Sequence, residues 1–309
     1  MLNVKYSKLV EEASEYWKWH TTHSIMAMDS QVAREGAGSE LRSPLFHFGT
    51  VLPIYLSVIR YLRKLPSTKG LRLVELGSGS GRLLAYLQSL FPDMEIIGTD
   101  YSEACINYAK IAYSQYGVKF IHDSAQKTTL KAGSMDFVIS SHVIEHVNKE
   151  DGYKFVAESK RLLKTGGMAF IGTPERKKSQ DIYGPNPNDE PTLRLVPPHE
   201  HEYTHAELTK LGQAIYGSKQ ARVDKIFNPV FYKIFSGSIK KFRHGAVNLV
   251  YRTIRDNLPK LWFDFITRTG AQLNMYLMGL SYHQILLSNT LASPKAGKTA
   301  DNLLLVAQK

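Results

Sequence analysis

The stretch that decides the fold of this chain reads Leu73-Val74-Glu75-Leu76-Gly77-Ser78-Gly79-Ser80-Gly81-Arg82-Leu83-Leu84. It joins an apolar run with a carboxylate near its end, three glycines at alternating positions and a leucine-rich helical pattern. This order predicts a buried strand, a tight turn and the start of a helix. Because glycine has no Cβ, the backbone of such a turn can come within contact distance of a ligand, which the open amide groups of the helix N-terminus would also face. The stretch therefore predicts a nucleotide-binding loop.

The spacing of the glycines separates two kinds of nucleotide ligand. A dinucleotide-binding loop reads G-x-G-x-x-G, whereas here the glycines alternate and Glu75 stands two residues before the first of them. A carboxylate at this position would repel a pyrophosphate and attract a cation. An NAD-dependent oxidoreductase would use the same fold, but the glycine spacing and the position of Glu75 argue against it.

An acidic residue followed by G-x-G-x-G resembles the first motif of the class I S-adenosylmethionine-dependent methyltransferases. The cofactor of that family carries a sulfonium and an ammonium group and no phosphate, which fits an acidic loop. The resemblance implies that this chain binds S-adenosylmethionine. The loop residues implied in cofactor binding are Glu75, Gly77, Ser78, Gly79 and Gly81.

The composition predicts a globular protein inside the cell. The chain has 309 residues, of which 43% are hydrophobic and 22% charged, enough for one large domain or one domain with an insertion. The single cysteine, Cys105, excludes an intramolecular disulfide and is typical of a reducing compartment. The first residues include Glu11, Glu12 and Glu15 and form no uninterrupted apolar segment, which argues against a signal peptide. We therefore expect a cytoplasmic protein.

Strand and helix patterns alternate from Leu71 onward, which predicts an α/β fold. We expect a Rossmann-like, doubly wound, mostly parallel seven-stranded sheet. Residues 1–66 would precede it as helices, including an amphipathic helix at Leu52–Leu65 that is ended by Pro66. The resemblance implies that this N-terminal segment covers the cofactor and part of the substrate pocket, although helices packed on the sheet edge would look the same. The expected divisions are an N-terminal helical cap at 1–66, a methyltransferase core at 67–227, a basic helical insertion at 228–299 and the last strand at 300–309.

Two acidic residues follow the second and third predicted strands. Asp100 stands after the strand at Met94–Thr99, about 20 residues beyond the glycines, where this class of fold places a ribose-binding acid. Tyr101 would pack either on the adenine face or within its own helix. The third strand, Val118–Ile121, leads to Asp123, which by the resemblance accepts from the adenine amino group, although an aspartate of a surface loop would look the same. The expected cofactor contacts after the glycine loop are Asp100, Tyr101, Asp123, Ser124 and Ser140.

The fourth predicted strand, Met135–Ser140, runs into Ser141-His142-Val143-Ile144-Glu145-His146-Val147. Its Glu-His-Val ending resembles small-molecule O- and C-methyltransferases of the family, including the quinone-pathway type, which commonly has a glutamate in the position of His142. His142, Glu145 and His146 stand at i, i+3 and i+4, so that a helix would place them on one face. H-x-x-E-H is also the signature of one metallopeptidase class, but its place directly after a strand, at the ligand-binding edge of the sheet, argues against a metal site.

A second histidine-rich segment reads Pro197-Pro198-His199-Glu200-His201-Glu202-Tyr203-Thr204. Thr204, with Glu207 three residues later, predicts a capping box and hence the start of a helix. The histidines His199 and His201 resemble those of a segment that some sugar, glycan and natural-product methyltransferases place over the acceptor pocket. A solvated loop would carry the same residues, and spacing alone does not show whether the segment meets His142.

Three further strands complete the predicted sheet, at Met168–Gly172 after a turn at Leu163–Gly167, at Ala221–Phe227 and at Asn302–Ala307. Between the last two, residues 228–299 carry apolar side chains at helical spacing with basic ones mostly opposite. This pattern fits a surface helix on an anionic membrane, a helix lining the way to a lipid-linked acceptor, or a helix packed on the core. The most apolar stretch, Leu273–Leu287, is interrupted by polar residues and is too short to span a membrane.

The resemblance implies an S-adenosylmethionine-dependent methyltransferase that acts on a hydroxyl, or another nucleophile, of a small molecule, a sugar or glycan, or a lipid-linked acceptor. A hydroxyl acceptor needs a base, and histidine is suited because its unperturbed pKa lies near neutrality. We expect His142 or His146 to be this base, with His199 and His201 as the next candidates. Glu145 would orient an imidazole or accept from the substrate.

Two other interpretations concern partners and activity. The net charge of +11 permits anionic partners, but the fourth strand does not end in the Pro-Pro-aromatic pattern of nucleic-acid amino-methyltransferases, so we expect no nucleic-acid partner. A cofactor-binding protein without catalysis, in a regulatory or scaffolding role, would keep Glu75 and Asp100 and tolerate loss of the histidines.

Overall fold

The computed structural model describes residues 52–79, 81–101, 103–176, 200–226 and 302–309, and five single residues between 265 and 275. Most of the expected cap at 1–66 and of the basic insertion at 228–299 therefore lies outside the described residues, as does His199. The three alternatives for the insertion, a membrane contact, a helix lining the way to the acceptor and a helix packed on the core, stay open for the same reason. No helix in the described part of the chain is long and apolar enough to cross a membrane.

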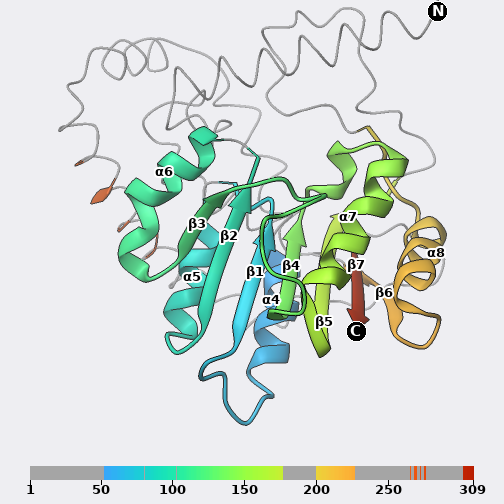
Figure 1. Ribbon diagram of the computed structural model, residues 1–309, viewed down its shortest axis with the longest axis horizontal. Helices are drawn as coiled ribbons and strands as arrows, with labels where there is room; N and C mark the ends of the chain where they lie inside the picture. Colours follow the sequence, from blue (N-terminus) through green and yellow to red (C-terminus); the bar gives the residue numbers. More distant parts are fainter. Residues whose placement is uncertain are drawn as a thin grey trace, which may run out of the picture.

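Seven strands form one sheet in the order β3-β2-β1-β4-β5-β7-β6 (Figure 1). The strands are β1 (Arg72–Leu76), β2 (Glu95–Asp100), β3 (Lys119–His122), β4 (Met135–Ser141), β5 (Leu163–Pro174), β6 (Ala221–Ile226) and β7 (Asn302–Gln308). All the pairings from β3 to β5 are parallel, whereas β7 runs antiparallel to both β5 and β6. The predicted doubly wound, mostly parallel seven-stranded sheet is therefore confirmed.

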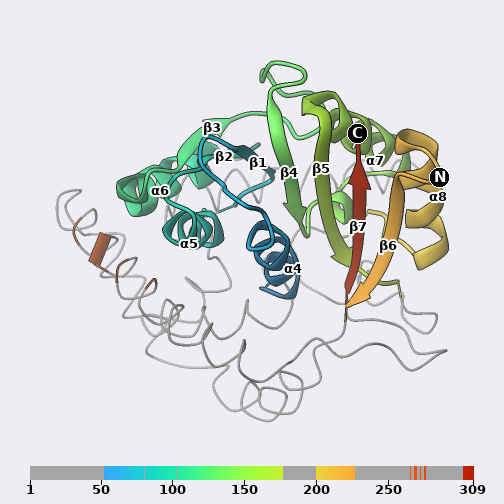
Figure 2. The same cartoon turned by 90° about the horizontal axis from the view of Figure 1, so that it is seen from below.

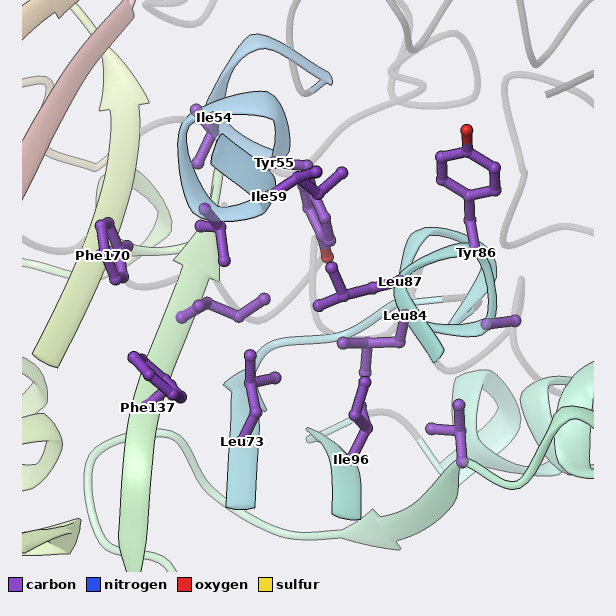
Figure 3. Close-up of a cluster of buried hydrophobic side chains, with 14 of the residues drawn as sticks. Ile54, Tyr55, Ile59, Leu73, Leu84, Tyr86, Leu87, Ile96, Phe137 and Phe170 are labelled. Carbon is purple, nitrogen blue, oxygen red and sulfur yellow. The ribbon is translucent and has the colours of Figure 1, made fainter. Parts of the chain in front are cut away.

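Helices cover both faces of this sheet, as Figure 2 shows. One face carries α4 (Leu52–Leu62), α5 (Arg82–Leu90) and α6 (Glu103–Tyr113), and the other carries α7 (Lys149–Leu162) and α8 (His205–Tyr216). Both faces are buried, which is why the central strands read as nearly continuous apolar runs. On the first face, Leu73, Ile96 and Phe137 of the sheet lie below α4 and α5 (Figure 3).

The bounds of two elements differ from the sequence prediction. β5 begins at Leu163 and includes the expected turn at Leu163–Gly167, because the end of the chain pairs with it: the Gly166 amide donates to the Lys309 carbonyl at 2.7 Å, and the Lys309 amide donates to the Gly167 carbonyl at 3.0 Å. α4 ends at Leu62 and not at Leu65. The predicted capping box at the start of α8 is confirmed, with Thr204 and Glu207 exchanging both hydrogen bonds.

Gly172 marks the place where α4 packs most closely on the sheet. A Cβ on this residue of β5 would lie 2.1 Å from Cδ1 of Ile54. Gly172→Ala should therefore lower the free energy of unfolding by about 1–3 kcal/mol through overpacking. Ile54→Ala should cost about 2–5 kcal/mol alone, and the double variant should cost less than the sum because the smaller residue makes room. Urea denaturation measures all three, and strictly additive losses would contradict this packing.

Candidate functional site

The ends of β1, β2 and β4 meet at one edge of the sheet, because these parallel strands are neighbours. The glycine loop leaves β1 there and is tied to β2: the amides of Gly77 and Ser78 both donate to the Thr99 carbonyl at 2.8 Å. The Thr99 hydroxyl in turn donates to the Glu75 carbonyl at 3.0 Å. Thr99 of β2 therefore ties the end of β1 and the start of the loop to the neighbouring strand.

The three glycines of the loop have different surroundings, although all have positive φ (76°, 53° and 77° at Gly77, Gly79 and Gly81). A Cβ on Gly77 would lie 2.3 Å from Val143, and one on Gly81 would lie 2.4 Å from Phe120. A Cβ on Gly79 would meet no described atom within 4 Å. Packing thus explains the first and third glycines, and the second leaves bare backbone toward open space.

Asp100 stands beside this bare backbone. Its Oδ2 atom accepts from the Gly79 amide at 2.8 Å, which places the predicted ribose acid directly against the loop. Gly81, the N-cap of α5, has no side chain to cap the helix. The structure therefore brings together the predicted residues of the loop and Asp100.

Glu75 has a partner that sequence reasoning missed. The hydroxyl of Tyr55, on α4, donates to Oε1 of Glu75, and each of the two side chains is only 3% exposed. Burial raises the pKa of Glu75, the hydrogen bond from Tyr55 lowers it and the charge of Asp100 raises it, to a value of about 8. One sequence signal could have pointed to this role of Tyr55. Its hydroxyl stands on the apolar face of an amphipathic helix, and a buried tyrosine hydroxyl usually has a hydrogen-bond partner.

Asp123 and Ser124 shape a loop at the end of β3. Oδ1 of Asp123 accepts from the Ser124 amide at 2.9 Å, and Oδ2 accepts from the Thr129 amide at 2.7 Å and from its hydroxyl at 2.8 Å. The Ser124 hydroxyl donates to Gln126 at 2.8 Å. These bonds fix the loop, and the predicted contact of Asp123 with adenine stays a prediction.

Tyr101 and Ser140 differ in exposure. The side chain of Tyr101 is 81% exposed at the end of β2, next to His122, and it does not pack into the core. Ser140 is buried and its hydroxyl donates to the Leu76 carbonyl at 2.8 Å. Ser140 therefore joins the end of β4 to the end of β1, and its contact with a cofactor also stays a prediction.

His142 has the one positive φ, 57°, among the described non-glycine residues. Its amide donates to the Gly172 carbonyl at 2.9 Å, and its Nδ1 lies 3.2 Å from Oε1 of Glu145. The expected helix through this motif is a single turn of 3₁₀ helix at Ile144–His146, which begins after His142. The left-handed turn at His142, and not a shared helix face, brings the imidazole to the carboxylate.

Glu145 is completely buried, with a hydrogen bond at one carboxylate oxygen and an imidazole near the other. The Thr173 hydroxyl of β5 donates to Oε2 at 3.0 Å, and His142 contacts Oε1. Burial raises the pKa of Glu145, but the hydrogen bond and charge of His142 and the charge of His146 outweigh it, so that the pKa lies below its usual value. Glu145 is therefore a carboxylate that orients the His142 ring.

The second histidine segment meets the first. The amides of Glu200 and His201 both donate to the Glu145 carbonyl, at 2.8 and 3.1 Å. The His201 ring lies edge-on to Tyr203 with 4.6 Å between ring centres, and burial lowers the pKa of His201. The structure thus joins the backbone of His201 to the backbone of Glu145, a contact that sequence spacing did not show.

No group of three histidine, cysteine or acidic side chains in the described ranges is arranged to hold a metal ion. The H-x-x-E-H motif lies within these ranges, whereas His199 lies outside them. The prediction of no metal at the motif stays open to experiment.

Comparison with known sequences identifies relatives of the core. Residues 74–171 match the family model of a methyltransferase domain. An S-adenosylmethionine-dependent methyltransferase of Mycolicibacterium smegmatis is 32% identical over 153 residues, which cover 49% of this chain and 53% of that protein. A ubiquinone biosynthesis O-methyltransferase of Ruegeria sp. is 28% identical over 173 residues, which cover 53% of this chain and 67% of that protein. The chain thus spans about half of the first relative and two thirds of the second.

Comparison with solved structures confirms the fold. The chain resembles a structure described as a complex between the Haloferax volcanii Trm112 methyltransferase activator and a methyltransferase, with a TM-score of 0.50 and 16% identity. The likeness covers 91% of this chain and 96% of that one. At this identity it shows the Rossmann-like fold alone.

The buried acid Glu75 predicts a pH dependence of stability. The folded chain keeps a proton on Glu75 up to a pH of about 8, whereas the unfolded chain loses it near 4.5, so the folded state binds more protons between these values. The contribution of Glu75 to stability should therefore be complete below pH 4.5 and be lost as the pH rises toward 8. Between pH 5.5 and pH 8, Glu75→Gln should lose less of its free energy of unfolding than the wild type does, as measured by urea denaturation at the two pH values.

The exposed Glu103 of α6 provides a control for this experiment. Glu103→Gln should lose the same stability as the wild type between the two pH values. Equal losses in all three proteins would contradict the assignment of a protonated Glu75.

Proposed function

We propose that the chain methylates a hydroxyl, or another nucleophile, of a small molecule, a sugar or glycan, or a lipid-linked acceptor. The premise is that residues 74–171, which match a methyltransferase domain, form a class I S-adenosylmethionine-dependent methyltransferase domain. One observation carries the proposal: His142 is held in a left-handed conformation against the buried carboxylate of Glu145, at the sheet edge that also carries the glycine loop. Backbone strain of this kind costs about 1–3 kcal/mol and is concentrated at functional sites.

The described residues of the loop fit S-adenosylmethionine. A Cβ on Gly79 would meet no described atom within 4 Å, and the acidic side chains of Glu75 and Asp100 suit a ligand with positive charge. When bound, this cofactor supplies a methyl group on a positively charged sulfur, whose bond to carbon breaks with the electron pair passing to sulfur. The residues that would hold it are Glu75, Gly77, Ser78, Gly79, Gly81, Asp100, Tyr101, Asp123, Ser124 and Ser140.

His142 is the base that the geometry supports best. With Nδ1 directed to Glu145, the imidazole would accept the proton of the acceptor hydroxyl at Nε2 while the acceptor oxygen forms its bond to the methyl carbon. The Glu145 carboxylate, itself held by Thr173, stabilises the imidazolium that results. Proton transfer to a positioned base typically contributes about 10²–10⁴-fold to the rate. His146 and His201 lie next to this pair and would line the acceptor site.

The relatives support oxygen as the acceptor atom, since several of them are named ubiquinone biosynthesis O-methyltransferases. The methyltransferase match also favours this function over the NAD-dependent alternative. We propose the division of the chain into a cap, a core, an insertion and a last strand as well. It is supported by β7, which returns to the sheet between β5 and β6 after residues 228–299.

The function itself is tested by transfer of radiolabelled methyl from S-adenosylmethionine to panels of phenols, sugars and lipid-linked sugars. His142→Gln should lower kcat by about 10²–10⁴-fold while the affinity for S-adenosylhomocysteine stays nearly unchanged, as expected for a base that contacts only the acceptor. Glu145→Gln should lower kcat as well, because the imidazolium loses its stabilising charge.

His205 on α8, whose Nε2 lies 3.0 Å from the Val223 carbonyl, is the matched control, and His205→Gln should keep full activity. EDTA should have no effect. Inactivation by EDTA with recovery on adding a divalent ion would show that the H-x-x-E-H motif is a metal site and that the assignment of the base is wrong.

The cofactor loop provides a second test. Gly79→Ala should reduce the affinity for S-adenosylhomocysteine at least ~10-fold, because the methyl group would point where the ligand approaches, at a cost in stability of only about 1 kcal/mol. Gly77→Ala should destabilise the fold more strongly, because its Cβ would overlap Val143. Asp100→Ala should also lose cofactor affinity. Calorimetry and urea denaturation measure both effects, and normal binding by Gly79→Ala would remove that residue from the site.

A further inference from the structure

Tyr55 connects the buried acid of the glycine loop to a helix outside the matched domain. It lies on α4, 20 residues before Glu75, and donates its hydroxyl to Oε1 of that carboxylate. Figure 3 shows the Tyr55 ring extending from α4 toward α5, beside Leu84 and Leu87. The hydroxyl therefore reaches Glu75 through an otherwise apolar layer between helix and sheet.

Two described groups act on the charge of Glu75, the Tyr55 hydroxyl from α4 and the Asp100 carboxylate from β2. Its Oε2 atom is buried and accepts no hydrogen bond from the described residues. A buried carboxylate with one donor and a second carboxylate nearby is costly to ionise, and a cation would complete it.

Taking the proposed function as given, we infer that Tyr55 is a positioning residue of the cofactor site. Its hydrogen bond holds Glu75 beside the glycine loop and stabilises the ionised form of Glu75. Binding of the cationic cofactor then releases a proton from Glu75 to the solvent. The helix before the matched domain would then belong to the cofactor site through this one hydroxyl. Tyr55 need not touch the cofactor, because it acts through the carboxylate.

The direction of the linkage follows from the two acids. With a pKa of about 8, Glu75 is mostly protonated at pH 7 in the cofactor-free chain. Burial and the neighbouring Glu75 raise the pKa of Tyr55 well above its usual value, so the tyrosine keeps its proton and remains the donor. Because the bond from Tyr55 lowers the pKa of Glu75, its loss would leave the carboxyl group more firmly protonated.

Calorimetric titration of the full chain with S-adenosylmethionine, in two buffers of different ionisation enthalpy, counts the protons released. At pH 8 the wild type should release about half a proton more per bound ligand than Glu75→Gln does. Tyr55→Phe should release close to one proton more than Glu75→Gln does. The α-amino group of the ligand titrates near the same pH, but its contribution is common to all variants and cancels in the differences. At pH 7, Tyr55→Phe should bind about 10-fold more weakly, and the difference should shrink as the pH rises.

Tyr61→Phe is the matched control, since Tyr61 lies on the same helix with its ring edge-on to Phe137 and Phe170. It should behave as the wild type. If Tyr55→Phe is folded and matches the wild type in proton release and affinity, the inference is wrong and the proposed function stands. If Tyr55→Phe does not fold, Glu75→Gln decides, because proton release equal to that of the wild type overturns the inference. A wild type that does not bind S-adenosylmethionine would overturn both.

Discussion

The close contact of Gly77 with Val143 joins the two halves of the site. A side chain on Gly77 would lie 2.3 Å from a methyl group of Val143, so the loop after β4 can pack against the loop after β1 only because the first glycine of the motif is bare. Val143 stands next to His142, which carries the proposed base, and Gly77 opens the loop that carries the proposed cofactor site. The approach of the two loops thus depends on this contact between the backbone of Gly77 and the side chain of Val143.

Two buried glutamates near this contact are held in opposite states. Glu75 has one hydroxyl donor and a neighbouring carboxylate, and its pKa is raised to about 8. Glu145 lies between two histidines and accepts from Thr173, and its pKa is lowered although it is also completely buried. Environments that push the pKa values of similar groups apart are typical of active sites, where they separate the roles of the groups. The acid with the raised pKa lies in the proposed cofactor site, and the acid with the lowered pKa lies beside the proposed base.

The motif after β4 has a different backbone from the one that its sequence spacing suggested. The spacing of His142, Glu145 and His146 suggested a common helix face, but the structure has a left-handed residue followed by one 3₁₀ turn. The contact between His142 and Glu145 exists because the His142 amide is bound to Gly172 of β5, which turns the backbone at that point. The i, i+3, i+4 spacing describes side chains on a regular helix. It does not account for a backbone hydrogen bond to a neighbouring strand.

The sequence by itself determined the order of strands and helices, the glycine loop, the acid after β2 and the capping box of α8. All of these depend on local chemistry: apolar periodicity, the conformational freedom of glycine and hydrogen bonds between residues three apart. Only the tertiary structure decided that Tyr55 bonds to Glu75, that Thr173 holds Glu145 and that the amides of Glu200 and His201 bind the Glu145 carbonyl. These partners are 20, 28 and more than 50 positions apart, so no sequence pattern relates them. They meet because burying both faces of one sheet brings distant segments to the same edge, and a buried polar group must then bond to whatever the packing places beside it.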